Sequence, residues 1–91
     1  MARGSLHRDI GAALRRQFAH NLRHFRRKRG MTQHDLASAA GVGRTFVSQV
    51  ERGHFSVTLE TIGAFSAALG ISPAALMVPP AIEHRFSAVS A

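Results

Sequence analysis

The stretch TQHDLASAAGVGRTFVSQVERG, residues 32–53, decides the fold, because it carries two short helical patterns separated by a tight glycine turn. Thr32 and Asp35 have the spacing of a capping box, in which each side chain accepts a hydrogen bond from the other residue's backbone amide. Gly41 is expected to end the first helix, since the residue just past a helix often adopts a positive φ angle. The second pattern begins near Arg44 and ends at the last glycine of the stretch. Two helices joined by a turn of three or four residues are therefore predicted.

Apolar residues give each of these helices one face to bury. They recur at helical spacing, and they are Leu36, Ala37 and Ala40 in the first helix and Phe46, Val47 and Val50 in the second. The small alanines allow the two helix axes to approach closely at the bend. This arrangement predicts a helix-turn-helix. The same spacing also fits an ordinary helical hairpin inside a small bundle.

The outward face of the second helix favours DNA as a partner. It combines side chains that form hydrogen bonds and contains no acid: Arg44, Thr45, Ser48 and Gln49. In the major groove an Arg side chain can donate twice to guanine, and a Gln side chain can pair with adenine. Glu51 is the only acid of this helix. The alternative is an ordinary solvated face, although such faces usually mix acidic and basic residues.

The sequence around this stretch resembles the phage Cro/repressor-type helix-turn-helix family, the XRE-like transcriptional regulators. Four segments in register carry the resemblance between about residues 18 and 77: LRHFRRKRG at 22–30, MTQHDLASAAGV at 31–42, RTFVSQVERG at 44–53 and SVTLETIGAFSAALGISPAAL at 56–76. The resemblance implies an all-α, five-helix, phage-repressor-like DNA-binding domain whose second and third helices form the helix-turn-helix. The later segments look most like small stand-alone regulators, including controllers of restriction–modification operons.

The resemblance also implies roles for individual residues. Base edges would be read by Arg44, Thr45, Ser48 and Gln49, and phosphates would be contacted by Gln33, Arg52 and His54. Gln33 would also brace Arg44; the alternative is a helix-start residue without a ligand. Arg26 and Glu51 would form a structural ion pair between the first and third helices. For Phe46 two alternatives remain open: its ring packs against DNA, or it folds back on the following loop.

The composition sets limits on the class of protein. A chain of 91 residues is expected to form one domain. Its formal charge of +7, from 12 Lys and Arg against 5 Asp and Glu, favours a polyanionic partner. There is no Cys, which excludes disulfides and thiolate metal sites. No apolar run has the length of a membrane span or a signal peptide, so we expect a cytoplasmic bacterial or phage protein.

Three regions are predicted along the chain. Residues 1–11 form an N-terminal extension without a strong pattern, although Ser5 or Asp9 could cap a helix. Residues 12–78 form the helix-turn-helix DNA-binding domain. Residues 79–91 form a C-terminal tail outside the resemblance.

Three more helices are expected outside the central stretch. The first starts at Ala12 and ends before Gly30, and the basic cluster at 26–29 suits the negative end of its dipole or a contact with DNA. Another follows the N-cap Thr58, and a short fifth helix covers 74–77. The expected buried residues are Leu14, Phe18, Leu22 and Phe25 in the first of these helices and Leu59, Ile62, Phe65 and Leu69 in the next.

The remaining apolar and titratable residues leave several alternatives. Four apolar residues form either part of a dimer interface or a cap on the monomer core: Met77, Val78, Ile82 and Phe86. His20 and His24 have metal-ligand spacing, but no carboxylate or cysteine joins them, which favours a surface pair and no metal. No catalytic arrangement is recognised, so we predict neither an enzyme nor a cofactor.

The prediction for function is a sequence-specific transcriptional regulator that binds double-stranded DNA, at a pseudo-palindromic operator, as a homodimer. The main alternative is the antitoxin of a toxin–antitoxin pair, with the last eleven residues holding the toxin partner. Two weaker alternatives are non-specific binding of nucleic acid through charge alone and a basic amphipathic N-terminal helix on a membrane surface. The membrane reading conflicts with the need for those apolar residues in the core.

Overall fold

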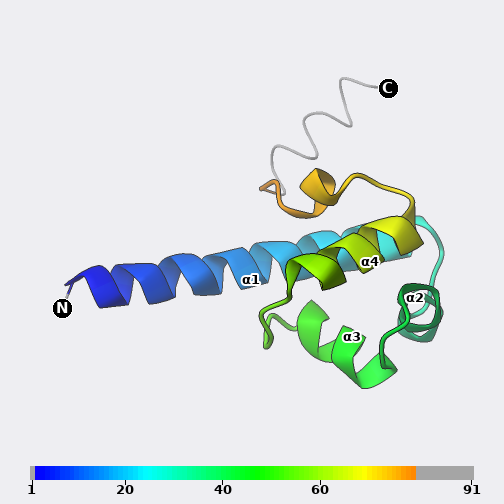
Figure 1. Ribbon diagram of the computed structural model, residues 1–91, viewed down its shortest axis with the longest axis horizontal. Helices are drawn as coiled ribbons and strands as arrows, with labels where there is room; N and C mark the ends of the chain where they lie inside the picture. Colours follow the sequence, from blue (N-terminus) through cyan, green and yellow to red (C-terminus); the bar gives the residue numbers. More distant parts are fainter. Residues whose placement is uncertain (1, 80–91) are drawn as a thin grey trace.

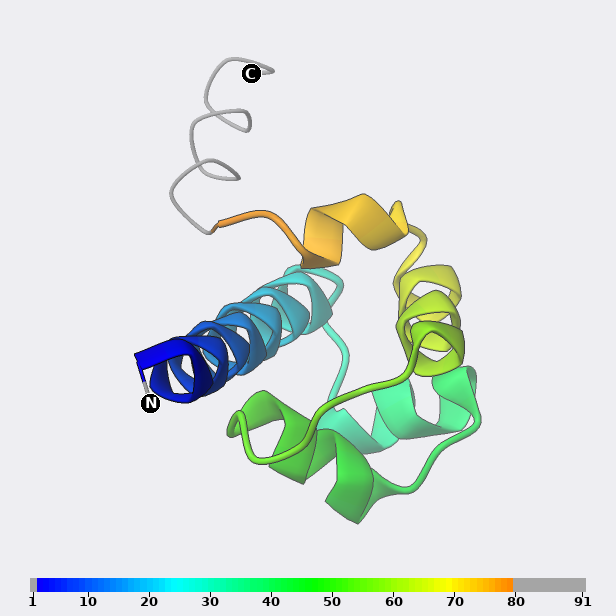
Figure 2. The same cartoon turned by 60° about the vertical axis from the view of Figure 1, so that its left-hand side comes forward.

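The computed structural model describes the backbone of residues 2–79 and the side chains from residue 7 onward. These residues form four α-helices and one 3-10 helix without any strand: α1 (Ala2–Lys28), α2 (Gln33–Ala40), α3 (Arg44–Glu51), α4 (Leu59–Leu69) and η1 (Pro73–Leu76). Helix α1 forms the long axis of the molecule (Figure 1). The other elements surround its C-terminal half, with α2 and α3 below, α4 to one side and η1 above (Figure 2).

Local hydrogen bonds fix the ends of the short helices where the sequence predicts them. The Thr32 hydroxyl accepts from the Asp35 amide at 3.0 Å, and the Asp35 carboxylate accepts from the Thr32 amide at 2.9 Å, so the capping box of α2 is confirmed. The hydrogen bond from the Thr32 amide to the carboxylate is the main cause that holds the pKa of Asp35 below its ordinary value, and the Thr32 side chain adds to it. Gly41 ends α2 with a φ of 73°, a conformation that costs residues with a Cβ about 1–2 kcal/mol. Thr58 caps α4 through the Thr61 amide.

The core lies where these helices meet the C-terminal half of α1. Its largest fully buried apolar side chains come from every element: Leu22, Leu36, Val47, Val50, Phe65, Leu69 and Leu76. Phe18, Phe25, Ala37 and Ile62 complete the cluster. All of these residues that lie in α1, α2, α3 or α4 were predicted to be buried, and the prediction is confirmed for each of them.

Two residues predicted to be buried are instead exposed. Leu14 is 44% exposed because α1 continues beyond the helices that cover its second half. Leu59 is 81% exposed. At 100° per residue it lies about a quarter turn from the buried side of α4, and it precedes the part of α4 that packs on α1.

The two ends of the predicted domain also differ from expectation. Helix α1 begins at Ala2 rather than Ala12, so the described part of the predicted extension 1–11 continues the helix. The predicted count of five helices is not confirmed, because the described residues form four α-helices and the fifth element, η1, is a single 3-10 turn. Ser72 caps it and Pro73 is its first residue, and the proline at position 79 follows too soon for a longer α-helical ladder.

Two amide side chains of α1 hold the segment that follows α4. The Asn21 Nδ2 atom is buried and donates to the carbonyl oxygens of Leu76 and Val78 at 2.9 and 2.7 Å. Gln17 donates to the carbonyl of Met77. The chain at 76–78 is therefore fixed on α1, whereas the predictions for Ile82, Phe86 and most of the tail 79–91 fall outside the described residues.

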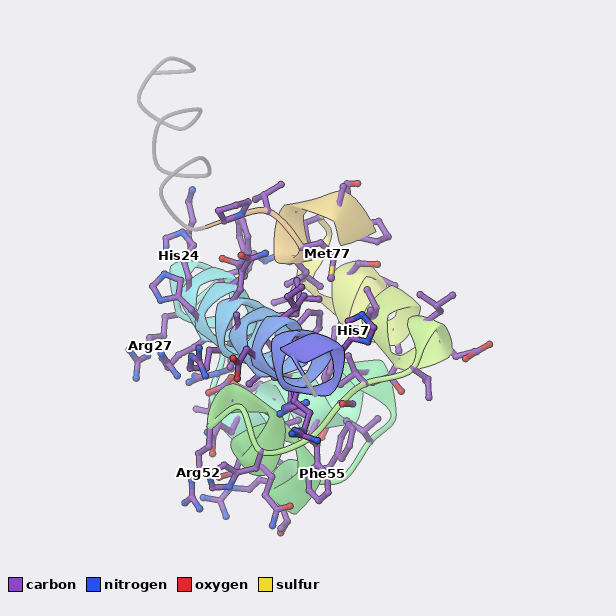
Figure 3. All side chains as sticks on the ribbon, turned by 90° about the vertical axis from the view of Figure 1, so that its left-hand side faces the viewer. His7, His24, Arg27, Arg52, Phe55 and Met77 are labelled. Carbon is purple, nitrogen blue, oxygen red and sulfur yellow. The ribbon has the colours of Figure 1, made fainter. Side chains whose placement is uncertain are left out.

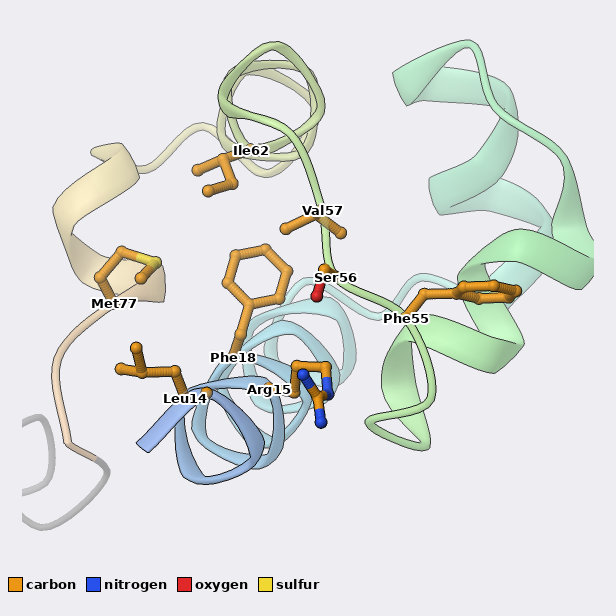
Figure 4. A pocket seen from close by; sticks show the side chains of 9 residues that line it. Leu14, Arg15, Phe18, Phe55, Ser56, Val57, Ile62 and Met77 are labelled. Atoms are coloured by element: carbon orange, nitrogen blue, oxygen red, sulfur yellow. The ribbon is translucent and has the colours of Figure 1, made fainter. Parts of the chain in front are cut away.

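An open apolar groove of about 210 Å³ lies between this segment, the free part of α1 and the loop after α3. Figure 4 shows Leu14, Phe18, Ile62 and Met77 pointing toward it. The exposed Leu14 and Met77 side chains form its rim. The groove thus marks the point at which α1 leaves the core.

Candidate nucleic-acid interface

Helix α3 separates its buried residues from its polar residues. Val47 and Val50 have almost no exposed surface and pack into the core. On the other faces Arg44 and Thr45 are exposed, and Ser48 and Gln49 are partly exposed. The four predicted base-reading side chains therefore lie on one short helix that turns its apolar residues inward.

A buried carboxylate fixes the far end of α3. The Glu51 side chain accepts from Arg26 twice, from Nε at 2.6 Å and from Nη2 at 3.0 Å. Both residues are buried, at 4% and 8% exposed. A planar guanidinium fork matches the two carboxylate oxygens, which makes this geometry both strong and directional. The structure thus brings Arg26 and Glu51 together and connects α1 to α3.

The same site connects α2 to α3. Gln33, the first residue of α2, donates from Nε2 to the Glu51 carboxylate at 3.2 Å. Arg26 also donates to the carbonyl of Met31, just before α2, at 2.8 Å. We expected Gln33 to brace Arg44, and the structure instead gives it Glu51 as its hydrogen-bond partner. Glu51 therefore holds the relative orientation of α1, α2 and α3.

Phe46 folds back rather than extending outward. Its ring stacks on Phe65 of the core at 6.4 Å and on Phe55 of the following loop at 6.1 Å between ring centroids. Of the two alternatives from the sequence, the structure supports the packing on the loop. Phe46 thereby supports the turn after α3 instead of joining the polar face.

The two remaining predicted phosphate contacts flank the C-terminal end of α3. Arg52 and His54 are both exposed. Their backbone amides are held, since both donate to the carbonyl of Gln49, at 3.2 and 3.0 Å. A positive φ of 76° at Gly53 turns the chain between them. Their side chains are thus presented to solvent from a fixed backbone.

Sequence reasoning missed two polar side chains that position this site. Arg23 donates from Nη1 to the backbone carbonyl of Glu51 at 2.8 Å and so occupies the end of α3. Asn21 holds the segment after η1, and its only signal was a polar residue beside the apolar positions of α1.

His20 and His24 stack with parallel rings whose centroids are 6.4 Å apart. Among the described residues no group of three metal-ligating side chains occurs.

A polar helix face held outward on a three-helix scaffold defines the class: a helix-turn-helix domain, with α2 and α3 as its two helices. Residues 22–76 match the family model described as Helix-turn-helix, HTH_3. The match covers more than half of the chain, so the chain belongs to this XRE-type helix-turn-helix family. The resemblance to the Cro/repressor-type regulators is thereby confirmed.

Named relatives and solved structures agree with this assignment. A hypothetical transcription factor of Neisseria meningitidis is 42% identical over 67 residues, covering 74% of this chain and 63% of that protein. The control protein C.BamHI of Bacillus amyloliquefaciens is 40% identical over 50 residues, covering 55% and 62%. The crystal structure of the restriction–modification controller C.AhdI from Aeromonas hydrophila has a TM-score of 0.69 at 38% identity, covering 70% of this chain and 97% of that one. The chain spans just under two thirds of the two curated relatives.

Proposed function

We propose that this protein is a sequence-specific, DNA-binding transcriptional regulator. One observation carries the proposal: α3 turns Arg44, Thr45, Ser48 and Gln49 away from a core that holds its other side. An α-helix fits the major groove of B-DNA, where each base pair presents a distinct pattern of donors and acceptors. Helix α3 would enter the groove and α2 would cross the backbone.

The side chains divide into two groups by the contacts that we propose for them. Arg44, Thr45, Ser48 and Gln49 would contact base edges and so choose the sequence. Gln33, Arg52 and His54 would contact phosphates and so set the register of the domain on the duplex. For Gln33 the hydrogen bond to Glu51 leaves the second amide hydrogen and the amide oxygen for further partners.

The regulator would act in the cytoplasm as a homodimer, without a cofactor and without catalysis. A twofold dimer prefers a pseudo-palindrome with half-sites about 34 Å apart. Among the described residues, no helix combines the length and the apolar character of a membrane span. Light scattering of the free protein and the symmetry of a selected operator test the dimer together.

The antitoxin alternative is less well supported. It depends on the last eleven residues, which lie outside the described part of the chain. The relatives reported above carry the names of a transcription factor and of control proteins. These names favour regulation of transcription, including control of a restriction–modification operon, over a toxin partner.

Arg44→Ala tests the base-reading role. An operator is first selected from random duplexes, and affinities are then measured for that operator, for single-base variants and for random DNA. We expect Arg44→Ala to cost about 1–3 kcal/mol on the operator and to relax base choice at one position. Arg52→Ala serves as the control and should weaken all duplexes evenly. Equal losses of Arg44→Ala on operator and random DNA would show non-specific binding through charge.

A further inference from the structure

The solvent-facing side of α1 carries a continuous row of cationic and imidazole side chains. Arg16, His20, Arg23 and Arg27 follow one another at intervals of four, three and four residues, which places them on one face of the helix. Two hollows of about 480 and 500 Å³ overlie this face and share His20 and Arg23. We call the surface lined by Arg16, His20, Arg23, Arg27, Lys28 and Arg52 the basic groove.

The basic groove adjoins the end of the helix that carries the base-reading face. Arg23 is anchored there by its hydrogen bond to the Glu51 carbonyl. The turn at Gly53 lies directly against α1, because a Cβ atom at this position would be 3.7 Å from Cγ of Arg16. Arg52 belongs both to the groove and to the proposed phosphate contacts. Figure 3 shows Arg27 and Arg52 toward the left-hand side of the molecule, with Met77 above α1 near the centre.

No acidic side chain compensates this charge among residues 7–79. Glu51 also lines one of the two hollows, but its carboxylate accepts hydrogen bonds from Arg26 and Gln33. Asp9 precedes Arg16 by seven residues, about 10 Å along the axis. Asp35 is engaged in the capping box of α2, and Glu60 lies in the first turn of α4. A concave surface with one sign of charge attracts a polyanion.

We propose that the basic groove binds backbone phosphates of the DNA that flanks the operator, on the same duplex that α3 enters. The inference rests on the proposed function. Arg52 supports the inference, because this residue lines the basic groove and is also one of the proposed phosphate contacts beside α3. The span from Arg16 to Arg27 is about 16 Å along the helix axis, comparable to about five phosphates of one strand. Flanking DNA that follows the groove would bend toward α1.

Two matched variants of the full chain test this inference. Arg16→Gln/Arg27→Gln removes two charges from the groove at exposed positions. The two side chains make no hydrogen bond among those of the described residues, so the fold does not depend on them. Arg8→Gln/Arg15→Gln is the control, because it also removes two charges from α1 and neither residue lines the groove. Both lower the formal charge from +7 to +5. Circular dichroism verifies that each variant folds, and Arg27→Gln alone replaces the groove variant should the double variant unfold.

Affinities are measured against salt on two duplexes, the minimal operator and the same operator extended by about one helical turn on each side. For the wild type we expect tighter binding and a steeper salt dependence on the long duplex. The groove variant should lose this gain, with a slope of log K against log salt lower by about 1.8, or 0.9 for each lost phosphate contact. On the minimal operator it should match the control variant.

Equal binding of the two duplexes by a wild type that still selects its operator would overturn the inference and leave the proposed function intact. The same would follow if both variants reduced the slope on the long duplex equally. If a separate random duplex or an RNA competed for the groove without displacing the operator, the groove would belong to a second polyanion and the inference would be wrong. The absence of any operator preference would instead refute the proposed function itself.

Discussion

Removal of the Glu51 carboxylate should destabilise this domain more than any substitution on its surface. Glu51→Met leaves the guanidinium of Arg26 buried, with only its hydrogen bond to the Met31 carbonyl. Breaking a buried, hydrogen-bonded ion pair from one side costs about 3–5 kcal/mol. Small domains are stable by about 5–15 kcal/mol in total. The single variant should therefore lose about a fifth of its stability at the least, and nearly all of it at the lower end of that range.

The reverse variant and the double variant complete a thermodynamic cycle. Arg26→Met leaves the carboxylate with Gln33 as its remaining side-chain partner, and a similar loss is expected. Arg26→Met/Glu51→Met leaves no buried charge, and two well-packed apolar side chains often restore most of the stability. The double variant should thus be more stable than either single variant, which corresponds to a coupling energy of about 3 kcal/mol or more.

Urea unfolding followed by far-ultraviolet circular dichroism measures these differences, since the chain has no Trp or Tyr for fluorescence. With a slope of about 1 kcal/mol/M for a small domain, each single variant should shift the midpoint by about 3 M or more. A stabilising osmolyte allows the measurement of a variant that is unfolded in buffer. Single-variant losses below about 1 kcal/mol that simply add in the double variant would refute the reasoning and mean that solvent screens the pair.

Three further perturbations have local causes. Gly41→Ala and Gly70→Ala should each cost about 1–2 kcal/mol through their left-handed backbones. The new Cβ at position 70 would lie 2.9 Å from the Arg29 guanidinium, but this group is the far end of an exposed side chain that can move away, so the urea midpoints of the two variants should be similar. Asn21→Leu removes two buried hydrogen bonds and should cost about 1–3 kcal/mol, with faster amide exchange around η1. Because hydrogen bonds depress the pKa of Asp35, its contribution to stability should be present above the pKa of the unfolded chain and be lost as pH falls through the folded pKa; Asp35→Asn should flatten that part of the stability profile.

Local features of the fold were predictable from the sequence. The Thr32–Asp35 capping box and the end of α2 at Gly41 depend on residues within a few positions of one another. A hydroxyl three residues from a carboxylate, or a glycine after an apolar pattern, therefore carries enough information by itself. The buried faces of α2 and α3 were predictable for the same reason, because helical periodicity is local.

Features that depend on where the core ends were not predictable. Leu14 continues the apolar positions of α1, but its exposure follows from the arrangement of α4 and η1 in space. The helical start at Ala2 has no capping signal, and α1 carries no acid in its first turn. The attachment of η1 to α1 depends on the hydrogen bond from Asn21 to the Leu76 carbonyl, which joins residues 55 positions apart and so needs the full fold.

The candidate site shows the same division. The polar face of α3 could be identified from residue types, because its apolar positions fix which side faces the core. The contact between Gln33 and Glu51 could not, since it joins residues 18 positions apart whose distance depends on the packing of three helices. The stacking of Phe46 on Phe55 and Phe65 likewise needed the full fold.

The attachment of α3 through its inner side has a consequence for how relatives of this protein could diverge. Arg44, Thr45, Ser48 and Gln49 make no side-chain hydrogen bond to the rest of the domain among the bonds of the described residues. Under the proposed function, new residues at these four positions would change what the helix recognises at little expense to folding. The scaffold can thus stay the same while these four residues are exchanged. A lineage could acquire a new target by a few substitutions, without changes in the core.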